Sequence, residues 1–293
     1  MQVGIIGVGL MGHGIARNIL LRGGFTLSFL DHPGNQPTDD LVGLGARACA
    51  TPAEIAGAAE VAILCVTGSA QVEAIITGES GLASALGPGT VVVDCSTALP
   101  DSTLRMAKVV RRAGGDYIDA PMTRTARHAH EGTLNLLAGG AAEVLDRVRP
   151  VLAAFTENID HVGPLGQGHR LKLLHNYVSV GFMTLLAEAA AQAADSGVDP
   201  QVFVDVLANG GGASAALDRL APYITEQNRD SLPFSVSNAL KDIDYYRDMS
   251  KASGAATTVA DGVSEALAAP VSGDDGDAYV PELVRLFRRS PDS

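Results

Sequence analysis

The sequence contains few cysteines, few basic residues and no long apolar run, and each shortage excludes a class of protein. Three cysteines occur in 293 residues, at Cys49, Cys65 and Cys95, and their number and spacing fit neither a disulfide framework nor a metal site. The 21 basic residues are outnumbered by 33 acidic ones, and the net charge of -12 argues against nucleic acid or an anionic membrane as a partner. We see no apolar stretch of about 18 residues that could span a membrane. Without a basic, cleavable leader either, we expect a cytoplasmic protein.

The length and the hydrophobic content favour two domains. A chain of 293 residues with 46% hydrophobic residues is too long for one small core and can bury sizeable cores. Short β-rich runs alternate with helical patterns up to about residue 163, which predicts a parallel or mixed α/β sheet. Long Ala- and Leu-rich patterns follow, the first over 168–196, so we expect an α/β domain over 1–163 and an all-helical domain over 164–293. The expected strands span 2–6, 26–30, 61–66, 90–94, 116–119, 134–138 and 159–163.

The first expected strand runs directly into the segment GVGLMGHGIARNIL, which carries Gly7, Gly9 and Gly12 and opens a helical pattern. A helix start has unpaired N–H groups and partial positive charge, so a phosphate can bind there if no side chain blocks it. In this spacing the first glycine permits a tight turn, the second lets the backbone approach a pyrophosphate, and the third lets helix and strand pack closely. The glycines by themselves are equally compatible with a simple tight turn.

An acidic residue at the end of the second strand strengthens the dinucleotide interpretation. Asp31 follows that strand, 19 residues after Gly12. A carboxylate there can accept hydrogen bonds from the ribose hydroxyls of NAD and would repel the extra phosphate of NADP. Asp31 could instead be a turn residue before His32 and Pro33. Strand, glycines, helix, strand and acid together favour a bound dinucleotide, and Asp31 alone favours NAD over NADP.

Polar residues follow three further strands, where ligands of an open α/β sheet are expected to bind. Because Ser, Thr and Asp also favour turns, ordinary turn chemistry is the alternative at each place. The residues concerned are Thr67 after Val66, then Ser96 and Thr97, and finally Thr123, Arg124 and Thr125.

The segment GQGHRLKLLHNYVS (166–179) opens the long helical pattern and contains a further candidate site. Lys172, His175 and Asn176 stand at positions i, i+3 and i+4, so they share one helix face. Lys172 is either a solvated neighbour of Arg170 or a proton donor, since partial burial lowers the pKa of a lysine toward neutral pH.

Five segments taken together resemble the β-hydroxyacid dehydrogenase family, which includes hydroxyisobutyrate dehydrogenase and tartronate semialdehyde reductase. The resemblance covers nearly the whole chain and implies a Rossmann-like domain, a helical domain that forms a homodimer or homotetramer, and an active site between the two. The segments are GVGLMGHGIARNIL, DCSTALP (94–100), DAPMTRTARHAHEGTLNLLAGG (119–140), GQGHRLKLLHN and NALKDID (238–244).

The resemblance also implies roles for individual residues. Lys172 falls on the catalytic lysine, Asn176 on the asparagine that orients the substrate, and Thr97 and Lys241 on positions that contact cofactor or substrate. The expected cofactor residues are Gly7, Gly9, Leu10, Met11, Gly12, Asp31, Val66, Thr67, Thr97 and Lys241. The expected substrate residues are Ser96, Thr123, Arg124, Thr125, Lys172, His175 and Asn176.

The sequence departs from the family's pattern in two places. The usual Ser-Gly-Gly of the third segment is Thr123-Arg124-Thr125, and the first of two usual asparagines is His175. A guanidinium at Arg124 can pair with a carboxylate or with a bulkier oxyanion such as sulfonate, although an exposed loop arginine is the alternative. The loop is similar to that of sulfolactaldehyde reductases. Sulfolactaldehyde, succinic or tartronate semialdehyde and hydroxyisobutyrate therefore stay open as substrates.

These expectations combine into an NAD(P)-dependent oxidoreductase that moves a hydride between nicotinamide and a small anionic semialdehyde or hydroxy acid. Lys172 would give a proton to the substrate oxygen, or take it in the oxidative direction. We expect no metal, because His128 and His130 have no acidic or Cys partner at ligand spacing. The alternative class is a non-catalytic nucleotide-binding dimer, which the presence of both Lys172 and Asn176 disfavours.

Overall fold

The computed structural model describes residues 1–288, and the chain divides into two compact units. Unit 1 comprises Met1–Lys172, and unit 2 begins at Leu173. The division falls within helix α8 (Gln167–Asp195), the long helix that the sequence predicts over 168–196. Each unit has its own hydrophobic core, so the two are described separately.

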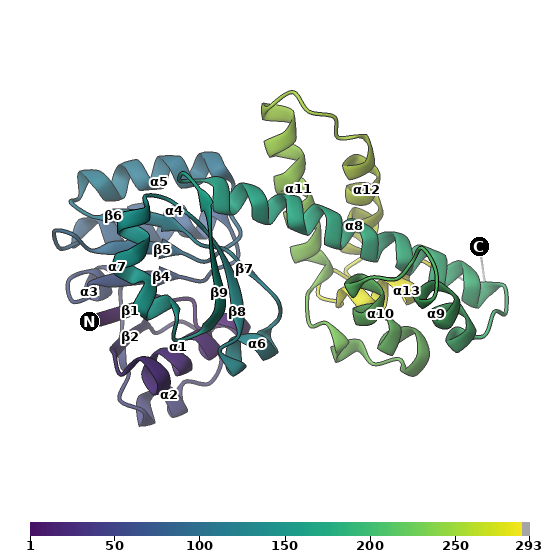
Figure 1. Ribbon diagram of the computed structural model, residues 1–293, viewed down its shortest axis with the longest axis horizontal. Coiled ribbons are helices and arrows are strands. Elements are labelled where there is room, and N and C mark those ends of the chain that lie inside the picture. The colour runs from purple at the N-terminus through teal and green to yellow at the C-terminus, as the bar shows by residue number, and fades with distance from the viewer. Residues whose placement is uncertain (289–293) are drawn as a thin grey trace. The chain divides into compact units, whose positions relative to one another are not determined.

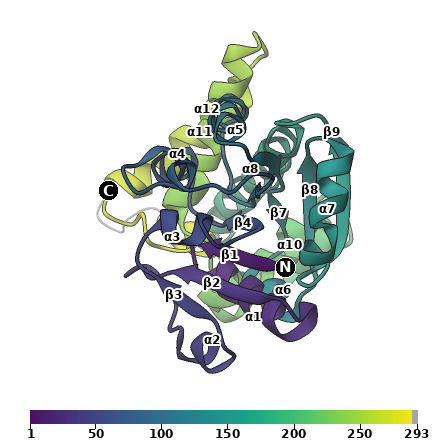
Figure 2. The same cartoon turned by 90° about the vertical axis from the view of Figure 1, so that its left-hand side faces the viewer.

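Unit 1 is built on a nine-stranded sheet with the order β3-β2-β1-β4-β5-β6-β8-β7, in which β9 pairs with β8 (Figures 1 and 2). Strands β1 to β6 run parallel, whereas β8 is antiparallel to β6 and β7. The strand order reverses at β1, which has β2 on one side and β4 on the other, and this is where open α/β sheets bind ligands. The strands are β1 (Gln2–Ile6), β2 (Thr26–Leu30), β3 (Arg47–Cys49), β4 (Val61–Leu64), β5 (Val91–Asp94), β6 (Asp116–Asp119), β7 (Met122–Thr123), β8 (Leu134–Gly139) and β9 (Thr156–Gly163).

Helices cover both faces of the sheet because its central strands are apolar on both sides. On β4, Val61 and Ile63 belong to the cluster formed with α1 and α7, whereas Ala62 and Leu64 belong to the cluster formed with α3, α4 and α5. The continuously apolar runs in the sequence predict this arrangement. The helices of unit 1 that precede α8 are α1 (Leu10–Gly23), α2 (Asp39–Gly43), α3 (Pro52–Ala56), α4 (Ser69–Thr77), α5 (Pro100–Arg112), α6 (Ala126–Glu131) and α7 (Ala142–Leu152).

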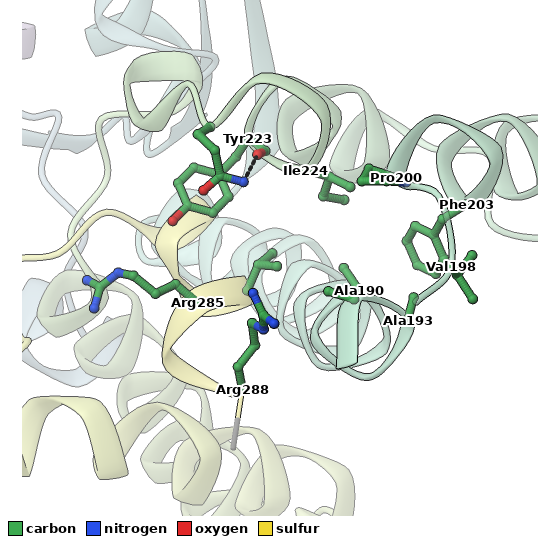
Figure 3. A pocket seen from close by; sticks show the side chains of 12 residues that line it. Ala190, Ala193, Val198, Pro200, Phe203, Tyr223, Ile224, Arg285 and Arg288 are labelled. Carbon is green, nitrogen blue, oxygen red and sulfur yellow. Dashed lines mark hydrogen bonds between the residues drawn. The ribbon is translucent and has the colours of Figure 1, made fainter. Parts of the chain in front are cut away.

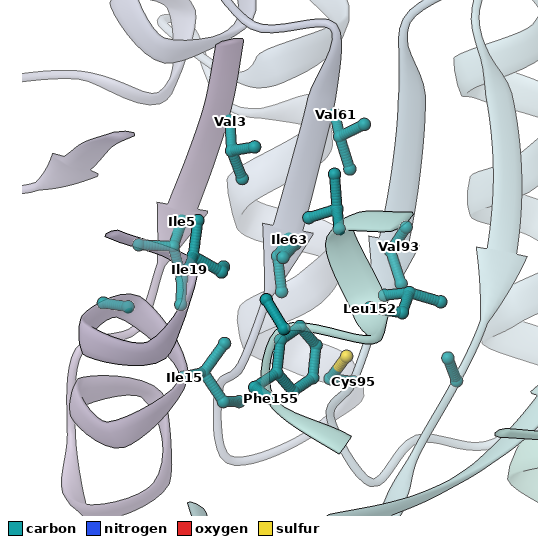
Figure 4. Packing of buried hydrophobic residues seen from close by; sticks show 14 of the residues in the cluster. Val3, Ile5, Ile15, Ile19, Val61, Ile63, Val93, Cys95, Leu152 and Phe155 are labelled. Atoms are coloured by element: carbon teal, nitrogen blue, oxygen red, sulfur yellow. The ribbon is translucent and has the colours of Figure 1, made fainter. Parts of the chain in front are cut away.

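Apolar packing fixes α1 on the sheet and thereby positions the turn that precedes it. Ile15 and Ile19 of α1 lie with Phe155 over Ile5 and Ile63 of the sheet, and all five side chains are fully buried (Figure 4). Burying one such side chain contributes about 1.5–3 kcal/mol. The β1–α1 turn is therefore held by strong packing on both of its sides.

Unit 2 consists of helices and loops between Leu173 and Arg288, with one isolated β-bridge between Ser235 and Tyr279. Side chains of Asp199, Ser214 and Ser235 accept hydrogen bonds from backbone N–H groups at three helix starts, as good N-caps do. Besides the later part of α8, the helices are α9 (Pro200–Ala208), α10 (Ala215–Glu226), α11 (Val236–Ala252), α12 (Thr258–Ser272) and α13 (Leu283–Leu286).

The sequence predicts the fold class and most of the strands. It misses β3 and β7, because segments of three and two residues are too short to show a period. The last strand begins at Thr156, earlier than the expected 159. Among the described residues, no helix combines the length and the apolar character that crossing a membrane requires.

Candidate functional site

The turn between β1 and α1 uses its three glycines in different ways. Gly7 has a φ of 97°, and a Cβ on it would lie 2.1 Å from the carbonyl oxygen of Cys65. A Cβ on Gly12 would lie 1.9 Å from the carbonyl oxygen of Gly7, so the helix can approach the turn only without a side chain. A Cβ on Gly9 would meet no atom within 4 Å. The space over Gly9 fits a pyrophosphate that approaches the backbone directly.

The first residues of α1 offer backbone rather than side-chain groups to a ligand. Gly9 is the N-cap and has no side chain to accept from the helix start. The N–H groups of Leu10 and Met11 are therefore suited to an anion. The Leu10 side chain is 48% exposed, and that of Met11 packs against the core.

The loop after β2 folds back onto the glycine turn. Asn35 accepts a hydrogen bond from the Val8 amide (3.3 Å) and donates one to the Leu30 carbonyl (2.9 Å). The Gln36 amide donates to the Val8 carbonyl (2.8 Å). Asp31, which begins this loop, is exposed. Sequence reasoning missed Asn35, because an asparagine in a loop looks like any turn residue.

The ends of β4 and β5 are joined by hydrogen bonds. The Val66 amide donates to Ser96 Oγ (3.1 Å), and the Ser96 amide donates to Asp94 Oδ1 (3.0 Å). Ser96 is 3% exposed, whereas Thr97 is half-buried and Thr67 is exposed. The structure thus brings Val66 and Ser96 together, as expected for residues that follow neighbouring parallel strands.

The loop after β7 holds the arginine that replaces a family glycine. Arg124 has a φ of 78°, which is uncommon outside glycine. Its Nη1 donates to the Thr133 carbonyl (2.5 Å) and forms an ion pair with Glu157. The sequence predicts either an anion-binding guanidinium or an exposed loop arginine here, and it does not predict the carboxylate 33 positions away that shares the charge of Arg124. Thr123 and Thr125 flank Arg124, and both are half-buried.

The predicted lysine lies in the second turn of α8. Lys172 is half-buried and closes unit 1. His169, one turn earlier, is fully buried, and sequence reasoning assigned it no role. Both belong to the segment that the resemblance singles out.

In unit 2, four neighbouring polar groups form a connected network. Asn176 Nδ2 donates to Asp242 Oδ2 (2.6 Å), and Lys241 Nζ donates to Asp242 Oδ1 (2.6 Å). Because a carboxylate only accepts, the Asn176 amide group is oriented with Oδ1 toward His175 Nδ1 (3.0 Å), which then donates. Lys241 also lies 4.9 Å from the ring centroid of Tyr245, a cation–π contact. The resemblance gave Lys241 a role and placed Asp242 in the same segment, but it did not predict that Asp242 joins Lys241 to Asn176.

A separate cavity of about 380 Å³ lies in unit 2 among α8, α9, α10 and α13 (Figure 3). Its walls include Phe203 and Ile224, together with Arg288, which pairs with Asp195 at 2.8 Å. None of the residues predicted to bind cofactor or substrate lines it. Within residues 1–288, no group of three His, Cys, Asp or Glu side chains is arranged to hold a metal ion.

Comparison with known proteins covers both units. Residues 2–163 match the model of the NAD binding domain of 6-phosphogluconate dehydrogenase. Residues 166–287 match the model described as NAD-binding of NADP-dependent 3-hydroxyisobutyrate dehydrogenase. The chain belongs to the β-hydroxyacid dehydrogenase family. Membership confirms the predicted family, which is an NAD(P)-dependent family of hydroxy-acid dehydrogenases.

Individual relatives of this chain support the same family assignment. The 2-(hydroxymethyl)glutarate dehydrogenase of Eubacterium barkeri is 33% identical over 74% of this chain and 72% of its own. The 2-hydroxy-3-oxopropionate reductase of Escherichia coli is 33% identical over 74% of each chain. The crystal structure of a 3-hydroxyisobutyrate dehydrogenase from Salmonella typhimurium has a TM-score of 0.87 and 26% identity, covering 98% of this chain and 100% of that one. The predicted Rossmann-like domain followed by a helical domain is confirmed.

Proposed function

We propose that this β-hydroxyacid dehydrogenase interconverts a small 3-hydroxy acid and its semialdehyde, with NAD as the preferred cofactor. NAD, when bound, would accept or supply the hydride. The observation that carries the proposal is the open backbone at Gly9, located where the strand order reverses and in the same unit as Ser96 and Lys172. The exposed carboxylate of Asp31 supports NAD over NADP, since it would repel a 2′-phosphate.

Lys172 is proposed to handle the proton of the reaction. Its ammonium group would stabilise negative charge that develops on the substrate oxygen and then donate a proton to it. In the oxidative direction the neutral amine would accept the proton of the hydroxyl group. Asn176, one helical turn later, would donate its second N–H to an oxygen of the substrate.

The acid group of the substrate is proposed to bind at the loop formed by Thr123, Arg124 and Thr125. The hydrogen bonds of Arg124 to Thr133 and Glu157 both use Nη1, so Nε and Nη2 would be the groups that pair with the acid group. A guanidinium pairs with carboxylate and sulfonate alike. Sulfolactaldehyde is therefore one candidate, supported by the similarity of this loop to sulfolactaldehyde reductases. Hydroxyisobutyrate and tartronate semialdehyde are the carboxylate alternatives.

Replacing Arg124 with leucine is expected to raise the KM for anionic substrates at least about 10-fold with kcat little changed. The variant loses an interaction with the acid group that is equally strong in the bound substrate and in the transition state. Steady-state kinetics would measure both constants. The matched control is Glu157→Gln, which releases the guanidinium from its ion pair and should leave KM unchanged or lower it. An unchanged KM in Arg124→Leu would reduce Arg124 to a loop anchor held by Glu157.

The experiment that tests the whole proposal is a panel of short hydroxy acids and semialdehydes, carboxylates against sulfonates, assayed with NAD and NADP by nicotinamide absorbance. We expect turnover of at least one hydroxy acid and its semialdehyde, with a higher kcat/KM when NAD rather than NADP is the cofactor. A protein that binds NADH but turns over no member of the panel would instead be a non-catalytic nucleotide-binding dimer.

We further propose that the chain is a homodimer or homotetramer. Exposed apolar side chains line one face of α8 at spacings of three, four and seven residues, namely Leu171, Leu174, Val178 and Leu185. An apolar stripe of this kind is typical of a face that a second protein surface covers. Light scattering of the purified chain should give a mass of two or four subunits, and a monomer at micromolar concentration would contradict the proposal.

A further inference from the structure

A fully buried histidine lies one helical turn before Lys172. His169 is 0% exposed and sits in the first turn of α8. Its Nε2 lies 3.1 Å from the Ser96 carbonyl oxygen, and its Nδ1 lies 2.6 Å from Thr103 Oγ1. Because a carbonyl oxygen only accepts, Nε2 carries the hydrogen of that bond. One side chain thus joins the start of α8 to the loop after β5 and to the first turn of α5.

The backbone of the same turn is held by a buried carboxylate. Asp119, at the end of β6 and 0% exposed, accepts from the amides of Gly166 and His169, both at 2.8 Å. A Cβ on Gly168 would lie 2.3 Å from the Leu137 carbonyl oxygen, so the helix start packs directly on β8. Burial raises the pKa of Asp119, which the His169 imidazole and the two amide N–H groups oppose. These backbone bonds keep the helix start in place without the His169 side chain.

A second buried carboxylate supports the Ser96 side of the arrangement. Asp94 accepts from the Ser96 amide (3.0 Å) and from the Tyr117 hydroxyl (2.9 Å), and its Oδ2 lies 3.8 Å from His169 Nε2. Burial raises the pKa of Tyr117 well above its usual value, so the phenol retains the proton that it donates. Ser96 is therefore held through its amide by Asp94 and through its carbonyl by His169.

We propose that His169 is a positioning residue for the reaction, which fixes the first turn of α8 against the loop that carries Ser96 and Thr97. Lys172 lies three residues after His169, about 4.5 Å further along the helix axis, so the position of that first turn fixes the position of Lys172. The backbone bonds of Asp119 locate the helix start. The imidazole sets the rotation of this turn relative to the Ser96 loop, because its two nitrogens bond α5 and that loop. The inference rests on the role proposed for Lys172.

The test compares His169→Leu, which removes both hydrogen bonds, with His169→Gln, whose amide can donate to Ser96 and accept from Thr103. We expect His169→Leu to lower kcat about 10- to 100-fold per folded molecule and to shift the pH profile of kcat, with NADH affinity within about twofold of the parent. His169→Gln should recover most of kcat. The matched control is His161→Leu, which removes a histidine whose Nε2 lies 2.8 Å from the Gly140 carbonyl in the same unit.

A second readout needs no turnover. Reductive methylation of the protein without cofactor, followed by mass spectrometry, gives the labelling rate of Lys172 relative to the exposed Lys251. We expect this ratio to change at least threefold in His169→Leu. We expect the same in Thr103→Val, a milder change that keeps the side-chain shape and removes one of the two hydrogen bonds of His169. An unchanged ratio together with an unchanged pH profile would overturn the proposal. Full activity of a Lys172→Ala variant would instead refute the proposed function and leave the labelling result to decide the role of His169.

Discussion

Replacing Lys172 with alanine is expected to lower kcat at least about 100-fold, because positioned acid–base groups contribute about 10²–10⁴-fold. The methyl group of alanine can neither stabilise charge on the substrate oxygen nor exchange a proton with it. Affinity for NADH, measured by fluorescence titration, should stay within about threefold, since the glycine turn lies on different elements from α8. Loss of turnover with retained cofactor binding would separate chemistry from binding.

The matched control is Arg170→Ala, which removes a half-buried cation two residues earlier on the same helix. It should leave kcat within about threefold, because the reaction depends on one ammonium group rather than on the local positive charge. Two results would contradict this mechanism. They are a Lys172→Ala enzyme with parental kcat, and an Arg170→Ala enzyme as impaired as Lys172→Ala.

Placing a methyl group at Gly9 is expected to weaken NADH binding about 10- to 100-fold while leaving the fold intact. The added Cβ would meet no protein atom within 4 Å, so the protein without cofactor accommodates it. The methyl occupies the space through which a pyrophosphate would reach the backbone N–H groups. Losing one charge-assisted hydrogen bond costs about 1.5–3 kcal/mol, which is roughly 10- to 100-fold in Kd. Isothermal titration and thermal unfolding of Gly9→Ala measure the two quantities.

The control is Gly12→Ala, where the same added methyl would lie 1.9 Å from the Gly7 carbonyl oxygen. The backbone must shift to relieve this overlap, so we expect unfolding free energy to fall by about 1–3 kcal/mol. The two variants should therefore separate binding from stability. If Gly9→Ala binds NADH as the parent does, the pyrophosphate does not lie over this turn.

Much of the fold follows from local patterns in the sequence. Strands β1, β2, β4 and β5 are mostly apolar runs, and α8 is an Ala- and Leu-rich helix of 29 residues. The glycine spacing likewise predicts a turn whose geometry the structure describes at Gly7, Gly9 and Gly12. These features can be predicted from the sequence because each depends only on residues within a few positions along the chain.

The hydrogen-bond and ion-pair partners of the polar groups could not be predicted from the sequence. Arg124 pairs with Glu157 across 33 positions, and the Val8 amide bonds Asn35 across 27. No repeating sequence pattern links residues that are so far apart along the chain. The sequence therefore did not predict that the carboxylate of Glu157 shares the charge of Arg124.

The sequence by itself determined the alternation of strand and helix, the glycine turn, the acid after the second strand and the helix that presents Lys172. The tertiary structure alone decided which buried groups hold these parts in register. His169 reaches Ser96 across 73 positions, and only the folding of α8 onto the ends of β5 and β6 brings the two together. The reason is physical: local pattern specifies which segments form, whereas buried hydrogen bonds between distant residues exist only after packing has excluded water from both partners.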